Sequence, residues 1–204
     1  MTEHVTPIIN AAALEPLFAP WEEPTRHRVR AATPGAPPDI KTYRRPSPVR
    51  LVNPLRAAVK EWRDLRYPGA SETTRELLAH WFERPQRMFD AVGEESEFRY
   101  YFCQREAIET FIYLLEARRL NSLSSLLFEF GGPTGETEAL GVRPEDDEWA
   151  RYAFKLATGA GKTKCMSLAI VWSYFHTLRE SDSPMARHFV VVAPNLTVFE
   201  SMPP

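Results

Sequence analysis

The feature that most constrains this chain is a glycine-containing loop that lies between an apolar run and a helical segment. The loop, residues 156–163, reads LATGAGKT and follows the apolar run at 152–157. Residues 162–178 are long enough for a helix, and residues 188–193 form a second apolar run. Continuous apolar runs are typical of strands buried on both faces of a parallel sheet, and a parallel pair needs a crossover helix. The order predicts a strand, a helix and a strand in an α/β domain.

The residue types of this loop suit a phosphate-binding site. Glycines let the backbone turn tightly, so that successive N–H groups point toward an anion at a helix N-terminus. Lys162 would place a positive charge against the β and γ phosphates, and the Thr163 hydroxyl could bind Mg²⁺. The alternative is a glycine turn with an incidental lysine, and Leu156 stands where the general pattern has its first glycine. The candidate nucleotide-binding residues of the loop are Thr158, Gly159, Ala160, Gly161, Lys162 and Thr163; Lys162 and Thr163 are the candidate catalytic pair.

The rest of the chain divides into regions of different composition. Ten of the 18 prolines fall in residues 1–54, which predicts an extended arm, because proline interrupts helices and central strands. Residues 55–100 are predicted to be largely helical, with helices at 55–66 and 72–82 around a Tyr67-Pro68-Gly69 turn. A longer helix is expected at 104–119, and residues 130–148 are expected to form an acidic surface loop.

Charge and cysteine content limit the classes of protein to which this chain can belong, but they do not identify its function. The net charge of −2 averages +4 in residues 1–66, −9 in 67–150 and +3 in 151–204, so only the two ends could attract phosphate. No apolar run approaches the roughly 20 residues that cross a bilayer. The two cysteines, Cys103 and Cys165, have no metal-ligand spacing and fit reduced thiols. We therefore expect a cytoplasmic protein without a membrane anchor.

Three segments together resemble a known family. The loop without its leading glycine is similar to motif I of superfamily 2 helicases. Residues 101–110 (YFCQREAIET) resemble the glutamine motif upstream of it, and residues 190–198 (VVVAPNLTV) resemble motif Ia. Residues 21–27 and the Tyr67-Pro68-Gly69 turn are also similar to the region before the motor in DEAD/DEAH-box helicases of the type III restriction enzyme Res-subunit type. The resemblance implies a RecA-like ATP-binding domain that begins near residue 101.

The resemblance also implies roles for single residues. Gln104 would hydrogen-bond the adenine edge and so favour ATP over GTP, with Phe102 or Tyr101 beside it as an aromatic wall. Asn195 and Thr197 would contact the DNA backbone. Simpler alternatives remain: Gln104 as an exposed polar residue at a helix start, and Asn195 and Thr197 as loop residues at a strand end.

The resemblance is incomplete, because a motor of this family also needs an Asp-Glu pair after a third strand and a second lobe, and family members carry a nuclease domain downstream. None of these is visible in residues 1–204, and the acidic cluster 145–148 precedes the phosphate loop. We therefore expect an ATP-binding and Mg²⁺-binding front end of a DNA helicase or translocase, truncated after motif Ia. Its partners would be DNA and a methyltransferase subunit. A standalone, non-catalytic nucleotide-binding module is the alternative.

Overall fold

The chain forms two compact units, Met1–Pro48 and Val49–Pro204. The computed structural model describes residues 19–29, 39–49, 51–89, 92–131 and 151–192. In the first unit, strands β1 (His27–Val29) and β2 (Asp39–Lys41) pair antiparallel, with Arg28 opposite Ile40. His27 Nδ1 lies 2.8 Å from the carbonyl oxygen of Tyr43, and the two rings meet edge to face. The described part of the proline-rich region therefore contains a short two-stranded ladder.

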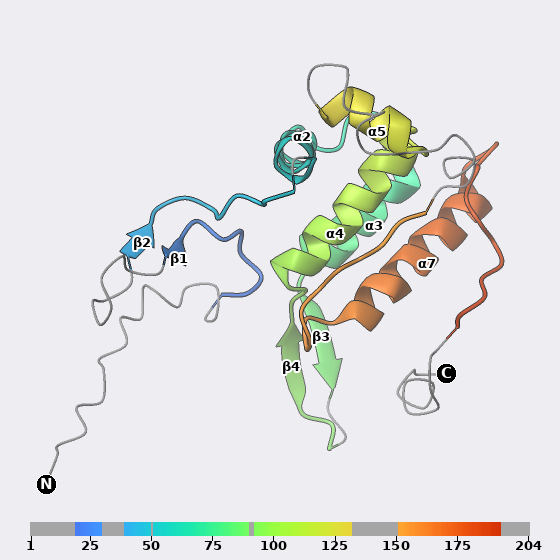
Figure 1. Ribbon diagram of the computed structural model, residues 1–204. Coiled ribbons are helices and arrows are strands. Elements are labelled where there is room, and N and C mark those ends of the chain that lie inside the picture. The colour runs from blue at the N-terminus through green and yellow to red at the C-terminus, as the bar shows by residue number, and fades with distance from the viewer. Residues whose placement is uncertain (1–18, 30–38, 50, 90–91, 132–150, 193–204) are drawn as a thin grey trace, which may run out of the picture. The chain divides into compact units, whose positions relative to one another are not determined.

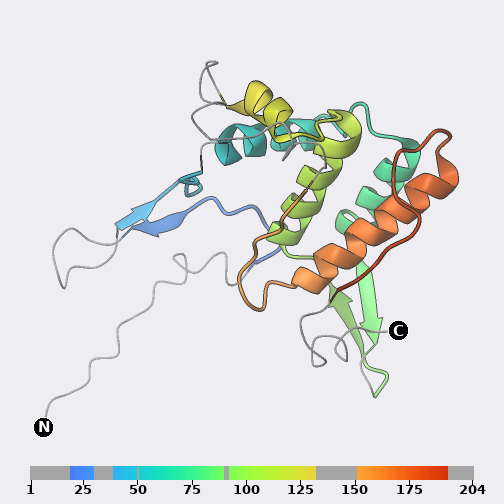
Figure 2. The ribbon, with the colours of Figure 1, turned by 45° about the vertical axis from the view of Figure 1, so that its right-hand side comes forward.

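The second unit is built around helices, and a single hairpin supplies its only strands among the described residues. In Figures 1 and 2 the hairpin extends beyond the end at which α4 and α7 begin. The elements are α2 (Val52–Asp64), α3 (Glu72–Phe82), β3 (Gln86–Phe89), β4 (Glu95–Phe98), α4 (Phe102–Ile112), the π-helix η2 (Tyr113–Ala117), α5 (Leu123–Phe130) and α7 (Lys162–Arg179).

The first two predicted helices are confirmed. Helix α2 begins three residues earlier than expected, at Val52, because Pro54 falls in its first turn, where a missing N–H breaks no helical hydrogen bond. Helix α3 has the predicted bounds, and the Ser71 hydroxyl caps it by accepting a hydrogen bond from the Thr74 N–H. Between them Arg66, Tyr67 and Gly69 all have positive φ angles, which turns the chain back on itself.

The third predicted helix is also present but changes character along its length. It starts at Phe102 and continues as a π-helix from Tyr113 to Ala117. Helices α3 and α4 both pack against α7, and α2 packs against α4 (Figure 1). Their shared core contains the fully enclosed side chains of Val59, Leu78, Ile108, Ile112 and Trp172. This helical core supports the start of α7, where the phosphate loop joins it.

The two predicted parallel strands are not formed in the described residues. Residues 151–157 and 188–192 have no strand structure, and the only ladders described are the antiparallel pairs β1–β2 and β3–β4. Val190 is 91% exposed and Val192 is 87% exposed, so burial on both faces is also wrong for this segment. A strand exists only when a neighbour accepts and donates its backbone hydrogen bonds, and an apolar run cannot supply that neighbour by itself.

The apolar run before the phosphate loop is used for packing instead. The rings of Tyr152 and Phe154 meet Phe111 edge to face at centroid distances of 5.4 and 5.5 Å. The Tyr152 hydroxyl donates to the carbonyl oxygen of Leu120 at 3.0 Å. These contacts hold the approach to the loop against α4. The structure is thus a mixed helix and strand fold, as the α/β prediction requires, without the predicted parallel pairing.

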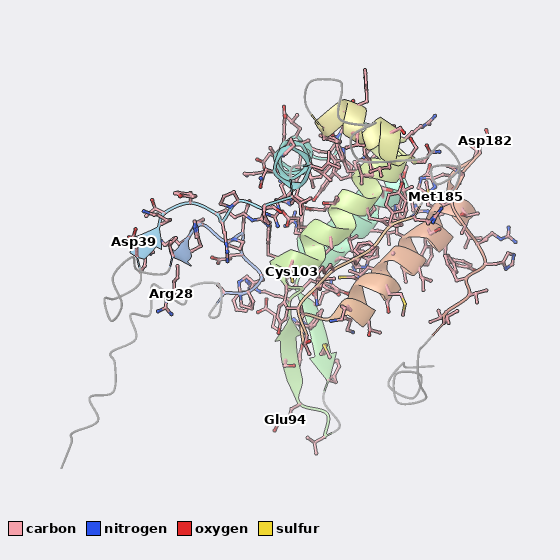
Figure 3. The ribbon with its side chains drawn as sticks, in the orientation of Figure 1. Arg28, Asp39, Glu94, Cys103, Asp182 and Met185 are labelled. Atoms are coloured by element: carbon pink, nitrogen blue, oxygen red, sulfur yellow. The ribbon has the colours of Figure 1, made fainter. Side chains whose placement is uncertain are left out.

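The β3–β4 hairpin and helix α5 in the second unit, like strands β1 and β2 in the first, were absent from the sequence-based prediction. The β3–β4 hairpin pairs Gln86 with Phe98 and Phe89 with Glu95, and Figure 3 places Glu94 at its tip. Helix α5 begins at a Ser122 cap and covers residues that the sequence left without an element. Residues 132–150, which include the acidic cluster 145–148, lie outside the described residues, so the predicted surface loop stays a prediction there.

Candidate nucleotide-binding site

The phosphate loop forms a tight turn that ends directly at a helix. The Ala160 N–H donates to the Ala157 carbonyl oxygen at 3.2 Å, which closes the turn. Gly159 has φ +78°, and Gly161, the residue before α7, has φ +76° and ψ +47°. L-residues with a side chain rarely adopt these angles, so both glycines are needed for the backbone path. The predicted glycine turn at the start of a helix is therefore present.

The first turn of α7 offers unpaired backbone donors. The Cys165 N–H donates to the Gly161 carbonyl oxygen at 3.3 Å, and the amides of Lys162, Thr163 and Lys164 precede this bond in the helix. The first N–H groups of a helix have no carbonyl partner within it. The helix dipole adds a partial positive charge at the same end. An anion placed at the start of α7 would meet both.

The two candidate catalytic side chains lie at the surface of the loop. Lys162 Nζ donates to the carbonyl oxygens of Leu156 at 3.3 Å and Ala157 at 3.1 Å, so its ammonium group crosses the start of the loop. Thr163 is exposed in the first turn of α7, as is Lys162. Thr158, in the turn before them, is exposed as well. The residues predicted to meet phosphate and Mg²⁺ are therefore together and accessible.

Gln104 joins the glutamine motif to the loop. Its side chain is buried, with 5% exposure, and its Nε2 donates to the Ala160 carbonyl oxygen at 3.0 Å. Its Oε1 accepts a hydrogen bond from the Tyr101 N–H at 3.0 Å. The alternative of an exposed polar residue at a helix start is therefore wrong. A carboxamide has two donor hydrogens and two acceptor lone pairs, so one of each is left for a ligand.

The two aromatic residues before Gln104 have different surroundings. Phe102 is 6% exposed, and the Arg63 guanidinium lies over its ring at 5.2 Å from the centroid. Tyr101 is 40% exposed and stands directly before α4. A stacked base needs an exposed ring, so the predicted aromatic wall at Phe102 is wrong, because this side chain is buried, and Tyr101 is the more accessible of the two.

A largely apolar cavity of about 470 Å³ adjoins the same region. Cys103 and Ala107 line it from α4, and Leu156, Ala157 and Ala160 line it from the loop. Figure 3 places Cys103 at the start of α4. Burial raises the pKa of the Cys103 thiol, and it raises the pKa of Cys165 on α7 to about 11. Both cysteines are free, so thiols rather than thiolates flank the loop at neutral pH.

Sequence reasoning missed a buried charged cluster on the other side of α4. The Glu109 carboxylate is fully buried and accepts hydrogen bonds from Arg63, Tyr67 and Arg105. Burial raises the pKa of Tyr67, and the negative charge of Glu109 raises it further. The Arg105–Glu109 pair has the i, i+4 spacing of helical ion pairs, and this was its only sequence signal.

Other predicted site residues lie outside the described residues. Asn195 and Thr197 belong to 193–204, so their role in DNA contact stays a prediction. Among the described residues, no group of three or more His, Cys, Asp or Glu side chains could hold a metal ion. No helix in the described part of the chain has the length and apolar character needed to span a bilayer.

The loop at the start of α7 and the Gln104 side chain bonded to it form one candidate site, and comparison with known proteins gives the family. A family model described as type III restriction enzyme, res subunit, matches residues 96–203, which is more than half of the chain. The chain therefore belongs to this family. The match includes Gln104, the phosphate loop and the segment with Asn195 and Thr197. No curated protein and no solved structure matches the chain.

Proposed function

We propose that this chain binds Mg·ATP and forms the front part of the ATP-driven motor of a type III restriction subunit. The observation that carries the proposal is the hydrogen bond from Gln104 Nε2 to the Ala160 carbonyl oxygen at 3.0 Å. It joins two motifs that are 56 residues apart in the sequence. Each motif by itself suggests nucleotide binding. Family membership supports the same conclusion.

In this proposal each residue has a defined role. The amides at the start of α7 and the Lys162 ammonium group bind the β and γ phosphates, and the Thr163 hydroxyl is a ligand of Mg²⁺. The remaining donor and acceptor of Gln104 pair with the adenine edge, and the exposed ring of Tyr101 provides a stacking surface beside it. ATP hydrolysis in the complete motor would drive movement along DNA.

The residues present fit such a ligand. A Cβ on Gly159 would meet nothing within 4 Å, so the outer side of the loop is open. A Cβ on Gly161 would collide with Gln104 Nε2, so the backbone and the glutamine approach each other as closely as glycine permits. A phosphate-binding loop needs one face of its backbone accessible to the anion. Its other face can pack against the protein, here against α4.

The test is Mg·ATP binding by the 204-residue chain, measured by calorimetry and by thermal unfolding. A ligand at 100 times its Kd should stabilise the folded state by about 2.7 kcal/mol. Lys162→Ala should weaken binding by about tenfold or more, whereas Lys164→Ala, which removes the same charge two residues along α7, should change it less than about threefold. Equal effects of the two substitutions, or no binding by the unaltered chain, would refute the proposal.

The proposed Mg²⁺ ligand and the proposed DNA contacts are tested by separate experiments. Thr163→Val should remove most of the difference in ATP affinity between buffers with Mg²⁺ and with EDTA. We propose Asn195 and Thr197 as DNA-backbone contacts, so the double substitution to alanine should weaken binding to DNA of any sequence alike. A methyltransferase partner is proposed from the family, and co-purification of the two subunits from one host tests it.

A further inference from the structure

The fully buried carboxylate of Glu109 binds three side chains from three parts of the second unit. Arg63 of α2 donates through Nε at 2.7 Å and Nη2 at 2.5 Å. The Tyr67 hydroxyl, from the turn after α2, donates at 2.8 Å, and Arg105 of α4 donates through Nε at 2.8 Å. Such a carboxylate is held in one position, because every donor around it would lose a charged hydrogen bond if it moved.

Arg63 also reaches the first turn of α4. Its guanidinium lies 5.2 Å from the centroid of the Phe102 ring, and Phe102 is the first residue of α4. One side chain therefore contacts α4 at two places almost two turns apart, at Phe102 and at Glu109. A planar guanidinium can stack on a ring and bind a carboxylate through two N–H groups at the same time, which an ammonium group cannot.

The first turn of α4 is also what orients Gln104. The Tyr101 N–H, immediately before Phe102, donates to Gln104 Oε1 at 3.0 Å. That bond directs Nε2 toward the Ala160 carbonyl oxygen. A shift of Phe102 would move the Tyr101 amide and rotate the carboxamide, because the two residues are covalently adjacent. The position of Arg63 is thus connected to the loop through three contacts and the peptide link between Tyr101 and Phe102.

We infer that Arg63 is a positioning residue for base selection: it holds the first turn of α4 so that Gln104 presents its free donor and acceptor to adenine. The inference rests on the nucleotide binding proposed above. Arg63 lies outside residues 96–203, the part that matches the family. Helix α2 would therefore contribute to nucleotide selection without touching the nucleotide.

The experiment compares the affinities of the chain for Mg·ATP, Mg·GTP and inorganic triphosphate. Arg63→Lys should lower the preference for ATP over GTP by about fivefold to tenfold, because one arginine can impose an orientation worth about 1 kcal/mol. The affinity for inorganic triphosphate, which has no base, should change less than about twofold. Arg66→Lys is the matched control, since Arg66 makes a single exposed ion pair with Glu83.

A double-substitution cycle separates positioning from general stability. In the Gln104→Ala background, Arg63→Lys should have no further effect on the ATP-to-GTP ratio, because the residue through which it acts is gone. An additive effect would overturn the inference, and so would an equal loss of ATP and triphosphate binding. If Arg63→Lys fails to fold, Tyr67→Phe replaces it in the experiment. This substitution removes one donor to Glu109 and should lower the ATP-to-GTP ratio by a smaller factor.

The outcomes also separate this inference from the function on which it rests. A chain that binds neither ATP nor inorganic triphosphate would refute the proposed function. A chain that binds both normally, and whose preference for ATP is unchanged by Arg63→Lys and by Tyr67→Phe, would refute only the role of Arg63.

Discussion

The two sides of α4 are held in very different ways. On the side of α2, Glu109 is fully buried and receives hydrogen bonds from three side chains. On the side of the phosphate loop, one side-chain hydrogen bond, from Gln104 to Ala160, is described between the helix and loop residues 156–163. The loop itself is mostly exposed. The difference indicates that α4 is held mainly by polar contacts on the side of α2, while the loop on its other side is more exposed.

The largest expected effect comes from removing the carboxylate on the enclosed side. Glu109→Ala should lower the free energy of unfolding by about 3–5 kcal/mol, because it leaves two guanidinium groups without their common anion. Urea denaturation followed by tryptophan fluorescence measures it. Glu83→Ala breaks only an exposed pair with Arg66 and should cost less than about 1 kcal/mol. Similar losses in the two variants would remove the contrast between the two sides.

Substitution of a second carboxylate, Glu116, tests whether Glu109 is the only carboxylate that contributes strongly to the free energy of unfolding. Glu116 in η2 accepts hydrogen bonds from the Ser71 N–H and the Thr74 hydroxyl, both at 2.6 Å, and lies 3.3 Å from His176 Nε2. Glu116→Ala should cost about 2–3 kcal/mol, since these donors would be left unpaired. Glu76→Ala, which removes an exposed partner of Arg179, is the control. A cost for Glu116→Ala no larger than that of the control would show that the polar contacts of Glu116 do not stabilise the packing of η2 against α3 and α7.

A smaller effect is expected on the loop side. Gly159→Ala and Gly161→Ala each place a side chain at a positive φ angle, which should cost about 1–2 kcal/mol. Gly161→Ala should cost about 1 kcal/mol more, because only its Cβ collides with Gln104 Nε2. This excess should disappear in the Gln104→Ala background. An excess that persists there would place the strain in the backbone and not at the contact with α4.

The smallest effect concerns a surface carboxylate at the end of α7. Glu180 accepts a hydrogen bond from the Thr73 N–H at 3.1 Å, and bonds from Thr73 lower its pKa from 4.5. A lowered pKa stabilises the fold fully above pH 4.5, and this contribution is lost as pH falls through the folded-state pKa. Since Glu180 is partly exposed to solvent, which screens the interaction, the contribution should be at most about 0.5 kcal/mol. Unfolding of the Glu180→Gln variant should therefore depend slightly less on pH between 5 and 3, and an identical pH dependence would contradict the assignment.

The helices could be predicted from the sequence because their signals are local. Helix α3 has the bounds 72–82 that were predicted, and its Ser71 cap is a local signal that the prediction did not use. The hydrogen bond between Gln104 and the loop was not predicted; the resemblance implied only that both would meet the same nucleotide. The parallel strands failed for the opposite reason: residues 188–192 have strand composition, but the hydrogen-bonding partner that a strand requires is not encoded in the run itself.

The remaining misses have physical causes of the same kind. Strands β3 and β4 are rich in charged residues and lack the alternating apolar pattern that identifies a strand, although Gly93 marks the turn between them. The pairing of Arg63 with Glu109 joins residues 46 positions apart, and no local spacing indicates it. Such long-range polar contacts depend on how helices cross, which the pattern of a single helix does not determine.

The position of the Lys162 ammonium group affects how the proposed phosphate ligand would bind. With its ammonium group on the carbonyl oxygens of Leu156 and Ala157, the lysine neutralises dipoles that would otherwise repel an arriving polyanion. The surrounding backbone is curved by the positive φ angles of Gly159 and Gly161. For the phosphate binding proposed above, only the flexible Lys162 side chain would have to move, so a preorganised loop would keep the entropic cost of association small.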